Sequence, residues 1–132
     1  MSMTDPIADY LTRIRNAMLV KHDQLDMPAS NLKVELSQIL KEQGYINDYE
    51  RISEQPSDRL RVVLRYNDDG VPAIRRLQRV SRPGRRIYCR KNEIKPVLSG
   101  IGTQVVSTSQ GLLTDSEARE RGVGGEILCE IW

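Results

Sequence analysis

The sequence predicts an α+β protein built from two small α+β domains packed together. Two observations lead to this prediction. The first half combines helical repeats of apolar residues with short alternating segments, whereas the second half consists of short strand-like segments joined by glycine-rich turns. A chain of 132 residues is long enough for two such domains. Because the turn-like run NDDG at 67–70 separates the two textures, we expect an N-terminal domain at residues 1–66 and a C-terminal domain at residues 67–132.

The N-terminal domain is expected to be a layer with the order helix, strand, helix, strand, strand. Thr4 or Asp5 can cap the first helix, and Pro6 suits its first turn. Apolar residues then recur at helical spacing, which predicts a helix with one buried stripe. The stripe consists of Ile7, Tyr10, Leu11, Ile14 and Met18.

A second helix is expected between Ser30, which can cap it, and Gly44, which can end it. The short run at 24–28 between the two helices could form a strand. Segments 45–52 and 59–66 alternate in polarity, and the turn-like QPSD between them favours a hairpin. The apolar face of the second helix comprises Leu32, Leu36, Ile39 and Leu40.

The C-terminal domain is expected to be mostly antiparallel, with short helices. Residues 82–90 (RPGRRIYCR) contain a Pro-Gly turn followed by a strand, and residues 103–109 and 111–114 are strand-like. Residues 92–100 hold a short helix at most, because Pro96 interrupts them.

The end of the chain combines a capped helix with a final strand. Thr114 is followed three residues later by Glu117, which is the pattern of a capping box, and Gly122 can stop the helix. The last segment, 126–132 (EILCEIW), alternates and predicts a strand. Its apolar face would comprise Ile127, Cys129 and Ile131.

The positive charge of the chain is concentrated in one segment. The net charge is only +2, yet residues 70–92 contain no acidic residue. This distribution indicates a localised anionic partner, and the alternative is a solvated basic segment that binds nothing. The basic residues of this segment are Arg75, Arg76, Arg79, Arg82, Arg85, Arg86, Arg90 and Lys91.

The sequence offers little for an enzyme, a metal site or a cofactor. The single histidine, His22, has no Cys or His neighbour, and Cys89 and Cys129 are expected to be reduced core thiols. The glycine-rich runs at 100–105 and 122–126 match neither a phosphate loop nor a dinucleotide fingerprint. A small nucleotide-binding or enzymatic domain is therefore the weaker alternative. No apolar run is long enough for a membrane span, and the N-terminus does not resemble a signal peptide.

Residues 101–114 carry no charge and contain three hydroxyl residues in a row, Ser107, Thr108 and Ser109. Hydroxyls act only at hydrogen-bond distance, so a partner must be attracted by other charges. RNA suits both requirements, because its shallow minor groove displays 2′-hydroxyls and base edges. The alternative is a turn whose hydroxyls bond their own backbone.

Two further features are open to two interpretations each. Gly122, Gly124 and Gly125 permit a close backbone approach or a positive φ, but they equally suit a helix stop and a tight turn. Tyr88, which is surrounded by arginines, either stacks on a base or lies in the core.

At these residues the chain closely resembles the bacterial form of small-subunit ribosomal protein eight. The resemblance rests on three motifs: DPIADYLTRIRNA at 5–17, RVSRPGRRIY at 79–88, and VVSTSQGLLTDSEARERGVGGEILCEIW at 105–132. They occur in the order of that family, and the resemblance covers essentially the whole chain.

The resemblance implies a primary binder of the central domain of small-subunit (16S-type) ribosomal RNA, which recognises an irregular RNA helix and helps to assemble the platform. It also implies a cytoplasmic, ribosomal location, small-subunit proteins five and twelve as neighbours, no cofactor, and a monomer when free. An alternative role is that of a repressor that binds the messenger RNA of its own operon with the same surface.

The resemblance also implies which residues contact RNA. Glu126 is the unexpected member, because a carboxylate repels phosphate unless it accepts a hydrogen bond or orients a neighbouring group. The expected contacts are the loop of Ser107, Thr108 and Ser109, the turn of Gly124, Gly125 and Glu126, the adjoining basic segment with Arg82, Arg85, Arg86 and Tyr88, and the start of the chain with Thr4, Asp5, Arg13 and Arg15.

Overall fold

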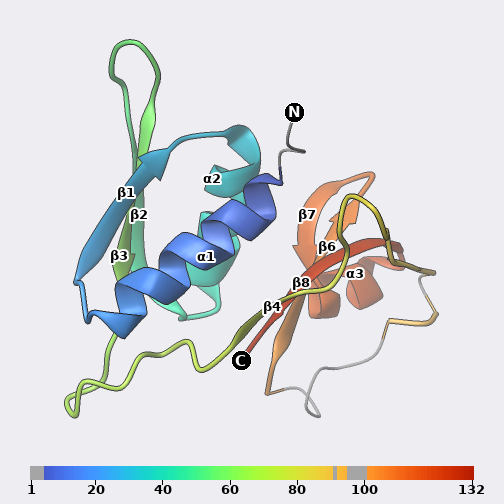
Figure 1. Ribbon diagram of the computed structural model, residues 1–132. Helices are drawn as coiled ribbons and strands as arrows, with labels where there is room; N and C mark the ends of the chain where they lie inside the picture. Colours follow the sequence, from blue (N-terminus) through green and yellow to red (C-terminus); the bar gives the residue numbers. More distant parts are fainter. Residues whose placement is uncertain (1–4, 91, 95–100) are drawn as a thin grey trace. The chain divides into compact units, whose positions relative to one another are not determined.

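The computed structural model describes residues 5–90, 92–94 and 101–132 (Figure 1). By its internal contacts the chain divides into two compact units. The first unit is Pro6–Arg75, and the second unit consists of Met1–Asp5 with Arg76–Trp132. Both units combine helix with antiparallel sheet, which confirms the predicted α+β class. The chain passes from one unit to the other nine residues beyond the expected boundary, so separate domains at 1–66 and 67–132 stay a prediction.

The first unit has the predicted order of helix, strand, helix, strand, strand. Its sheet is antiparallel, with β3 in the middle between β1 and β2. The Ser30 side chain caps the second helix by accepting a hydrogen bond from the Lys33 backbone N–H at 3.2 Å. The elements are α1 (Pro6–Leu19), β1 (Gln24–Pro28), α2 (Asn31–Glu42), β2 (Ile46–Ile52) and β3 (Arg59–Leu64).

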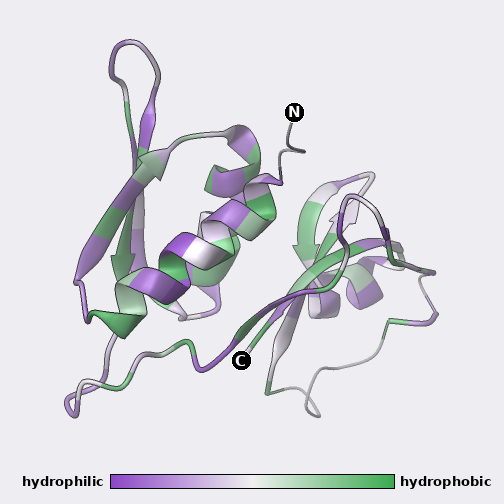
Figure 2. Ribbon diagram, viewed as in Figure 1, coloured by the Kyte–Doolittle hydropathy of each residue, from purple (hydrophilic) through white to green (hydrophobic). Residues whose placement is uncertain are grey.

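Each helix of the first unit buries one face, and hydrophobic and hydrophilic residues alternate along α1 (Figure 2). The predicted stripe of α1 is correct except at its end. Ala17 is buried there, while Met18 is only half-buried, because the position three residues after Ile14 faces inward in the last turn. Leu32 of α2 is likewise only half-buried.

Two polar contacts connect the helices, one inside the apolar core and one at its edge. The Tyr10 hydroxyl and Ser37 Oγ lie 2.8 Å apart, and Lys33 Nζ lies 2.8 Å from a carboxylate oxygen of Asp9. The Ser37 hydroxyl also bonds the Lys33 carbonyl oxygen at 2.9 Å. Buried polar groups of this kind need such partners, and these positions have them.

The second unit is built around its last strand, β8. One edge of β8 pairs with β6, which in turn pairs with β7. The other edge of β8 pairs with β5 near the start of the strand and with β4 near its end. The sequence did not predict β4, whose three residues are too few to show alternation. The elements are β4 (Leu77–Arg79), β5 (Tyr88–Cys89), β6 (Thr103–Thr108), β7 (Gly111–Thr114), α3 (Asp115–Arg121) and β8 (Gly125–Ile131).

Helix α3 begins and ends as its sequence predicts. The Thr114 hydroxyl accepts from the Glu117 N–H, and the Glu117 carboxylate accepts from the Thr114 N–H, both at 3.1 Å. Gly122 ends the helix with φ of +67°, a conformation that favours glycine. The helix packs its Ala118 against Leu113 of β7 and Cys89 of β5.

The final strand β8 is buried more completely than simple alternation predicts. Ile127, Cys129 and Ile131 are buried as expected, but Leu128 is buried too. A shift of register between β6 and β8 inserts Leu128 as an extra residue, so the two faces exchange there. Burial raises the pKa of the Cys129 thiol to about 12, so this thiol is an inert core group at neutral pH.

Most of the segment at 92–100 lies outside the described residues, and with it the expected short helix. Of the helices that the structure describes, none is long and apolar enough to cross a membrane.

Candidate nucleic-acid interface

Three of the expected RNA contacts form one row across three neighbouring strands. Ser107 of β6 is the register partner of Glu126 of β8, and Glu126 is also the register partner of Tyr88 of β5. Directly opposed residues of antiparallel strands project from the same face of a sheet. Residues 19 and 38 positions apart in the chain therefore present their side chains side by side. We call Tyr88, Glu126 and Ser107 the recognition row.

The recognition row lies on the face of the sheet that points away from α3. Cys89 and Leu113 pack in the cluster that contains Ala118 of α3. Successive side chains of a strand alternate between faces, so Tyr88, next to Cys89, projects to the opposite side. Tyr88 is 68% exposed. The alternative of a core tyrosine is therefore wrong, and the ring is accessible for stacking.

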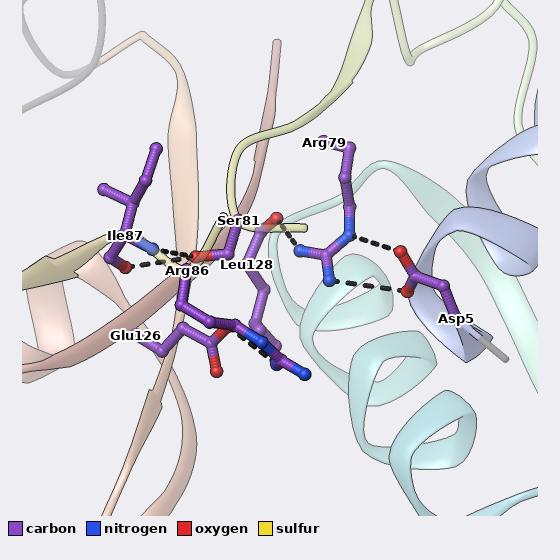
Figure 3. A network of polar contacts seen from close by, with 7 residues as sticks. All are labelled: Asp5, Arg79, Ser81, Arg86, Ile87, Glu126 and Leu128. Atoms are coloured by element: carbon purple, nitrogen blue, oxygen red, sulfur yellow. Dashed lines mark hydrogen bonds and ion pairs between the residues drawn. The ribbon is translucent and has the colours of Figure 1, made fainter. Parts of the chain in front are cut away.

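Glu126 does not present a bare carboxylate on this face. Arg86 donates a hydrogen bond from Nη1 to the Glu126 carboxylate at 3.0 Å (Figure 3). The Glu126 side chain is only 14% exposed, whereas that of Arg86 is 49% exposed. The hydrogen bond with Glu126 holds the pKa of Arg86 above its ordinary value. Glu126 thus neutralises part of the arginine charge and holds the guanidinium in place, so its carboxylate is compatible with the RNA contact that is expected here.

Gly125 brings the backbones of β8 and β6 together beside Ser107. A Cβ atom at this position would lie 2.1 Å from the Ser107 carbonyl oxygen and 2.9 Å from its carbonyl carbon. Any side chain would therefore push the two strands apart. Of the two interpretations of the glycine turn, Gly125 fits the close backbone approach and Gly122 fits the helix stop. Gly124 lies half-buried directly before β8.

The three hydroxyls of the β6–β7 turn serve different purposes. The Thr108 hydroxyl accepts from the Gln110 N–H at 3.0 Å and donates to the Gly111 carbonyl oxygen at 2.9 Å. It therefore stabilises its own turn, as the structural alternative supposed. In the part of the chain that the structure describes, the hydroxyls of Ser107 and Ser109 have no hydrogen-bond partner, and Ser109 is exposed. These two hydroxyls are available to a ligand.

Arg79 does not belong to the accessible basic surface. Its Nε and Nη2 lie 3.2 and 3.4 Å from the two carboxylate oxygens of Asp5, and its Nη1 donates to the Leu128 carbonyl oxygen (Figure 3). The Arg79 and Asp5 side chains are 10% and 17% exposed. The interpretation of the whole basic segment as an attracting surface is wrong at this position. The carboxylate of Asp5, an expected RNA contact, is engaged in the same pair.

The other basic residues of the second unit differ in their surroundings. The Arg76 guanidinium lies over the Trp132 ring, 5.7 Å from its centroid. The side chains of Arg82, Arg85 and Arg90 are exposed, while Lys91 lies outside the described residues. Three exposed arginines of this unit, Arg82, Arg85 and Arg86, therefore lie close together in the turn at 82–86.

The expected contacts at the start of the chain are only partly described. Thr4 lies outside the described residues. Arg13 and Arg15 are exposed on α1, in the first unit. Arg13 forms an ion pair with Asp9 at 3.0 Å, one turn earlier in the helix. A role of these residues toward RNA stays a prediction.

Within residues 5–90, 92–94 and 101–132, no group of three or more His, Cys, Asp or Glu side chains is placed to hold a metal ion. The site offers an aromatic ring, neutral hydroxyls and guanidinium groups. This set suits the base faces, sugar edges and phosphates of RNA.

The comparison with known proteins agrees with this chemistry. The family profile described as ribosomal protein S8 matches residues 5–132. The protein named small ribosomal subunit protein uS8 of Natranaerobius thermophilus is 58% identical over 132 residues, which cover 100% of both chains. The proteins of the same name from Acidobacterium capsulatum and Halothermothrix orenii are 53% and 51% identical, again over 100% of both chains. The chain therefore belongs to the ribosomal protein S8 family.

Proposed function

We propose that this chain binds the central domain of small-subunit ribosomal RNA and recognises an irregular helix there through its recognition row and the neighbouring arginines. As a ribosomal protein of the small subunit, the chain is a structural component and not an enzyme. The observation that carries the proposed RNA recognition is the alignment of Tyr88, Glu126 and Ser107 on the face of the sheet that points away from α3.

Attraction of the RNA is assigned to the arginines of the second unit. Arg82, Arg85 and Arg90 are exposed, and Arg86 is half exposed beside Glu126. Each phosphate contact changes the slope of log K against log salt by about 0.7–0.9. This term brings any polyanion to the surface and carries no sequence information.

Discrimination is assigned to the uncharged part of the surface. The hydroxyls of Ser107 and Ser109 can donate to and accept from 2′-hydroxyls and base edges, and the Tyr88 ring offers a stacking face. DNA lacks the 2′-hydroxyl, so these groups favour RNA. Each neutral hydrogen bond contributes about 1 kcal/mol, and more where a mismatch leaves a buried donor without a partner.

Footprinting tests the proposal directly. The isolated protein is added to a transcript of bacterial small-subunit ribosomal RNA, and the backbone positions that it protects are mapped. We expect protection of one irregular helix in the central domain, with a DNA oligonucleotide of the same sequence as a weak competitor. Uniform protection along the transcript, or equal competition by the DNA, would contradict the proposal.

The same surface could bind a second RNA, because the proposed recognition depends on the local shape of the RNA helix. A messenger RNA that folds into the same irregular helix would present the same sugar edges to the recognition row. The proposed repression of the chain's own operon requires such a helix. Competition between the operon transcript and the ribosomal fragment for the protein is the test, and contacts with small-subunit proteins five and twelve stay a prediction.

A further inference from the structure

The turn that carries three of the arginines is closed at its base by one buried hydroxyl. Ser81 is fully buried. Its Oγ accepts a hydrogen bond from the Ile87 N–H at 2.7 Å and donates one to the Ile87 carbonyl oxygen at 3.1 Å (Figure 3). One side chain thus holds both backbone groups of the residue at the other end of the turn. We call residues 82–86 the arginine turn.

Both ends of the arginine turn are attached to the same residue of β8. The Ser81 N–H donates to the Ile127 carbonyl oxygen at 3.0 Å, and the Ile127 N–H donates to the Ile87 carbonyl oxygen at 2.9 Å. The chain therefore leaves the edge of the sheet and returns to it at one point. At the base of the loop, Ser81 and Ile87 make no backbone hydrogen bond with each other, and the Ser81 hydroxyl takes its place.

The outer part of the arginine turn is closed separately. Arg82 and Arg85 exchange two backbone hydrogen bonds, each of 2.9 Å, around Pro83 and Gly84. The side chains of Arg82, Arg85 and Arg86 are all exposed. A loop that carries three like charges repels itself, so a defined arrangement depends on the contacts at its base.

We propose that Ser81 is a positioning residue for RNA binding: its hydroxyl fixes the arginine turn, and with it Arg86 and Tyr88, in the arrangement that meets the RNA. Preorganisation of this kind raises affinity because the ordering cost is met before the ligand arrives. This inference rests on the proposed function of the surface. It adds a buried residue that does not touch the RNA itself.

The chain offers a matched control in the first unit. Ser37 is fully buried like Ser81, and its hydroxyl also makes two hydrogen bonds, with the Tyr10 hydroxyl and the Lys33 carbonyl oxygen. Ser37→Ala should therefore lower the stability of the fold to a similar extent. It leaves the arginine turn intact, so it separates a loss of stability from a loss of positioning.

The experiment compares wild type, Ser81→Ala, Ser81→Cys and Ser37→Ala as full-length proteins. Ser81→Cys fills the same space with a weak hydrogen-bonding group, so it separates the hydrogen bonds from the packing. Affinity is measured with a transcript of the central domain of bacterial small-subunit ribosomal RNA at several salt concentrations. Amide hydrogen exchange of residues 82–87 is measured without RNA, and melting temperatures are recorded for all four proteins.

We expect Ser81→Ala and Ser81→Cys to bind about tenfold more weakly than wild type, with an unchanged salt slope and faster exchange in residues 82–87. Ser37→Ala should bind as wild type does. The inference is overturned if Ser81→Cys keeps wild-type affinity or if Ser37→Ala binds as weakly as Ser81→Ala. Failure of the wild-type protein to bind the transcript would instead overturn the proposed function, and the inference with it.

Discussion

Arg86 and Glu126 form an ion pair of 3.0 Å between the arginine turn and the middle of the recognition row. The carboxylate is mostly buried and the guanidinium is half exposed, so the pair offers its positive end to a ligand. Positive charge and neutral hydroxyls thereby meet on one face.

Glu126→Gln should reduce discrimination rather than overall binding. The amide keeps the shape of the side chain but no longer neutralises Arg86, so attraction to any RNA increases. We expect weaker preference for the central-domain transcript over an unrelated RNA, by about three- to tenfold. Titration of both RNAs with wild type and variant measures this ratio. An unchanged ratio would show that Glu126 does not orient Arg86 for recognition.

Ser109→Ala and Arg86→Ala should have opposite signatures. Loss of a neutral hydroxyl should weaken binding of the central-domain transcript about fivefold, which corresponds to ~1 kcal/mol, without a change in salt slope. Loss of the guanidinium should lower the slope by about 0.7–0.9. Salt-dependent titrations of both variants provide the test, and identical signatures would contradict the proposed division of roles.

Gly125→Ala should destabilise the second unit. The new Cβ would lie 2.1 Å from the Ser107 carbonyl oxygen, so β6 and β8 must move apart, at a cost of about 1–3 kcal/mol. Gly84→Ala is the control, because among the described residues a Cβ there has no heavy atom within 4 Å apart from its own residue and its two chain neighbours. Urea unfolding measures both variants. Equal free energies of unfolding for the two variants would mean that the close approach is not required.

Arg79→Met should affect stability and not RNA attraction. The variant removes the guanidinium that pairs with the mostly buried Asp5 carboxylate, so we expect a loss of about 2–4 kcal/mol in the free energy of unfolding. Arg82→Met, an exposed change, should leave stability unaltered and lower the salt slope of RNA binding. Denaturation and salt titration of both variants distinguish a structural arginine from a binding one.

Asp9→Asn should lower the stability of the first unit at neutral pH but not in acid. Lys33, and then Arg13, lower the pKa of the Asp9 carboxyl below its ordinary value of 3.8. A depressed folded-state pKa contributes stability above pH 3.8, and this contribution is lost as the pH falls through the folded-state value. Because Asp9 is partly exposed, the difference should be about 1 kcal/mol or less.

Urea unfolding at pH 7 and near pH 2 checks this dependence. The gap between wild type and Asp9→Asn should close at the lower pH. Asp48→Asn, which removes the exposed partner of Lys41, is the control and should give a smaller gap. A gap of equal size at both pH values would exclude the ion pair as its cause.

Local chemistry in the sequence predicted most of the elements. The Ser30 cap, the capping box of Thr114 and Glu117, and the glycine that stops α3 all depend on groups within a few residues of one another. Such contacts form in the same way whatever lies elsewhere in the chain. The spacing of apolar residues likewise predicted the buried faces of α1 and α2, except at Met18 and Leu32, which lie near a helix end.

The sequence by itself therefore determined the α+β class, the helix boundaries and the residues from which the site is assembled. Tertiary structure decided which of these residues are exposed on one face of the sheet and which are engaged within the protein. Arg79 and Arg82 are equivalent in the sequence, yet Asp5 holds the first in a mostly buried pair while the second lies on the exposed arginine turn. The accessibility of Tyr88 and the backbone contacts of Ser81 likewise depend on pairing with β8, some 40 residues further along the chain. The hydrophobic pattern of a strand indicates which of its faces is buried, but which distant strand pairs with it is decided only when the whole sheet packs.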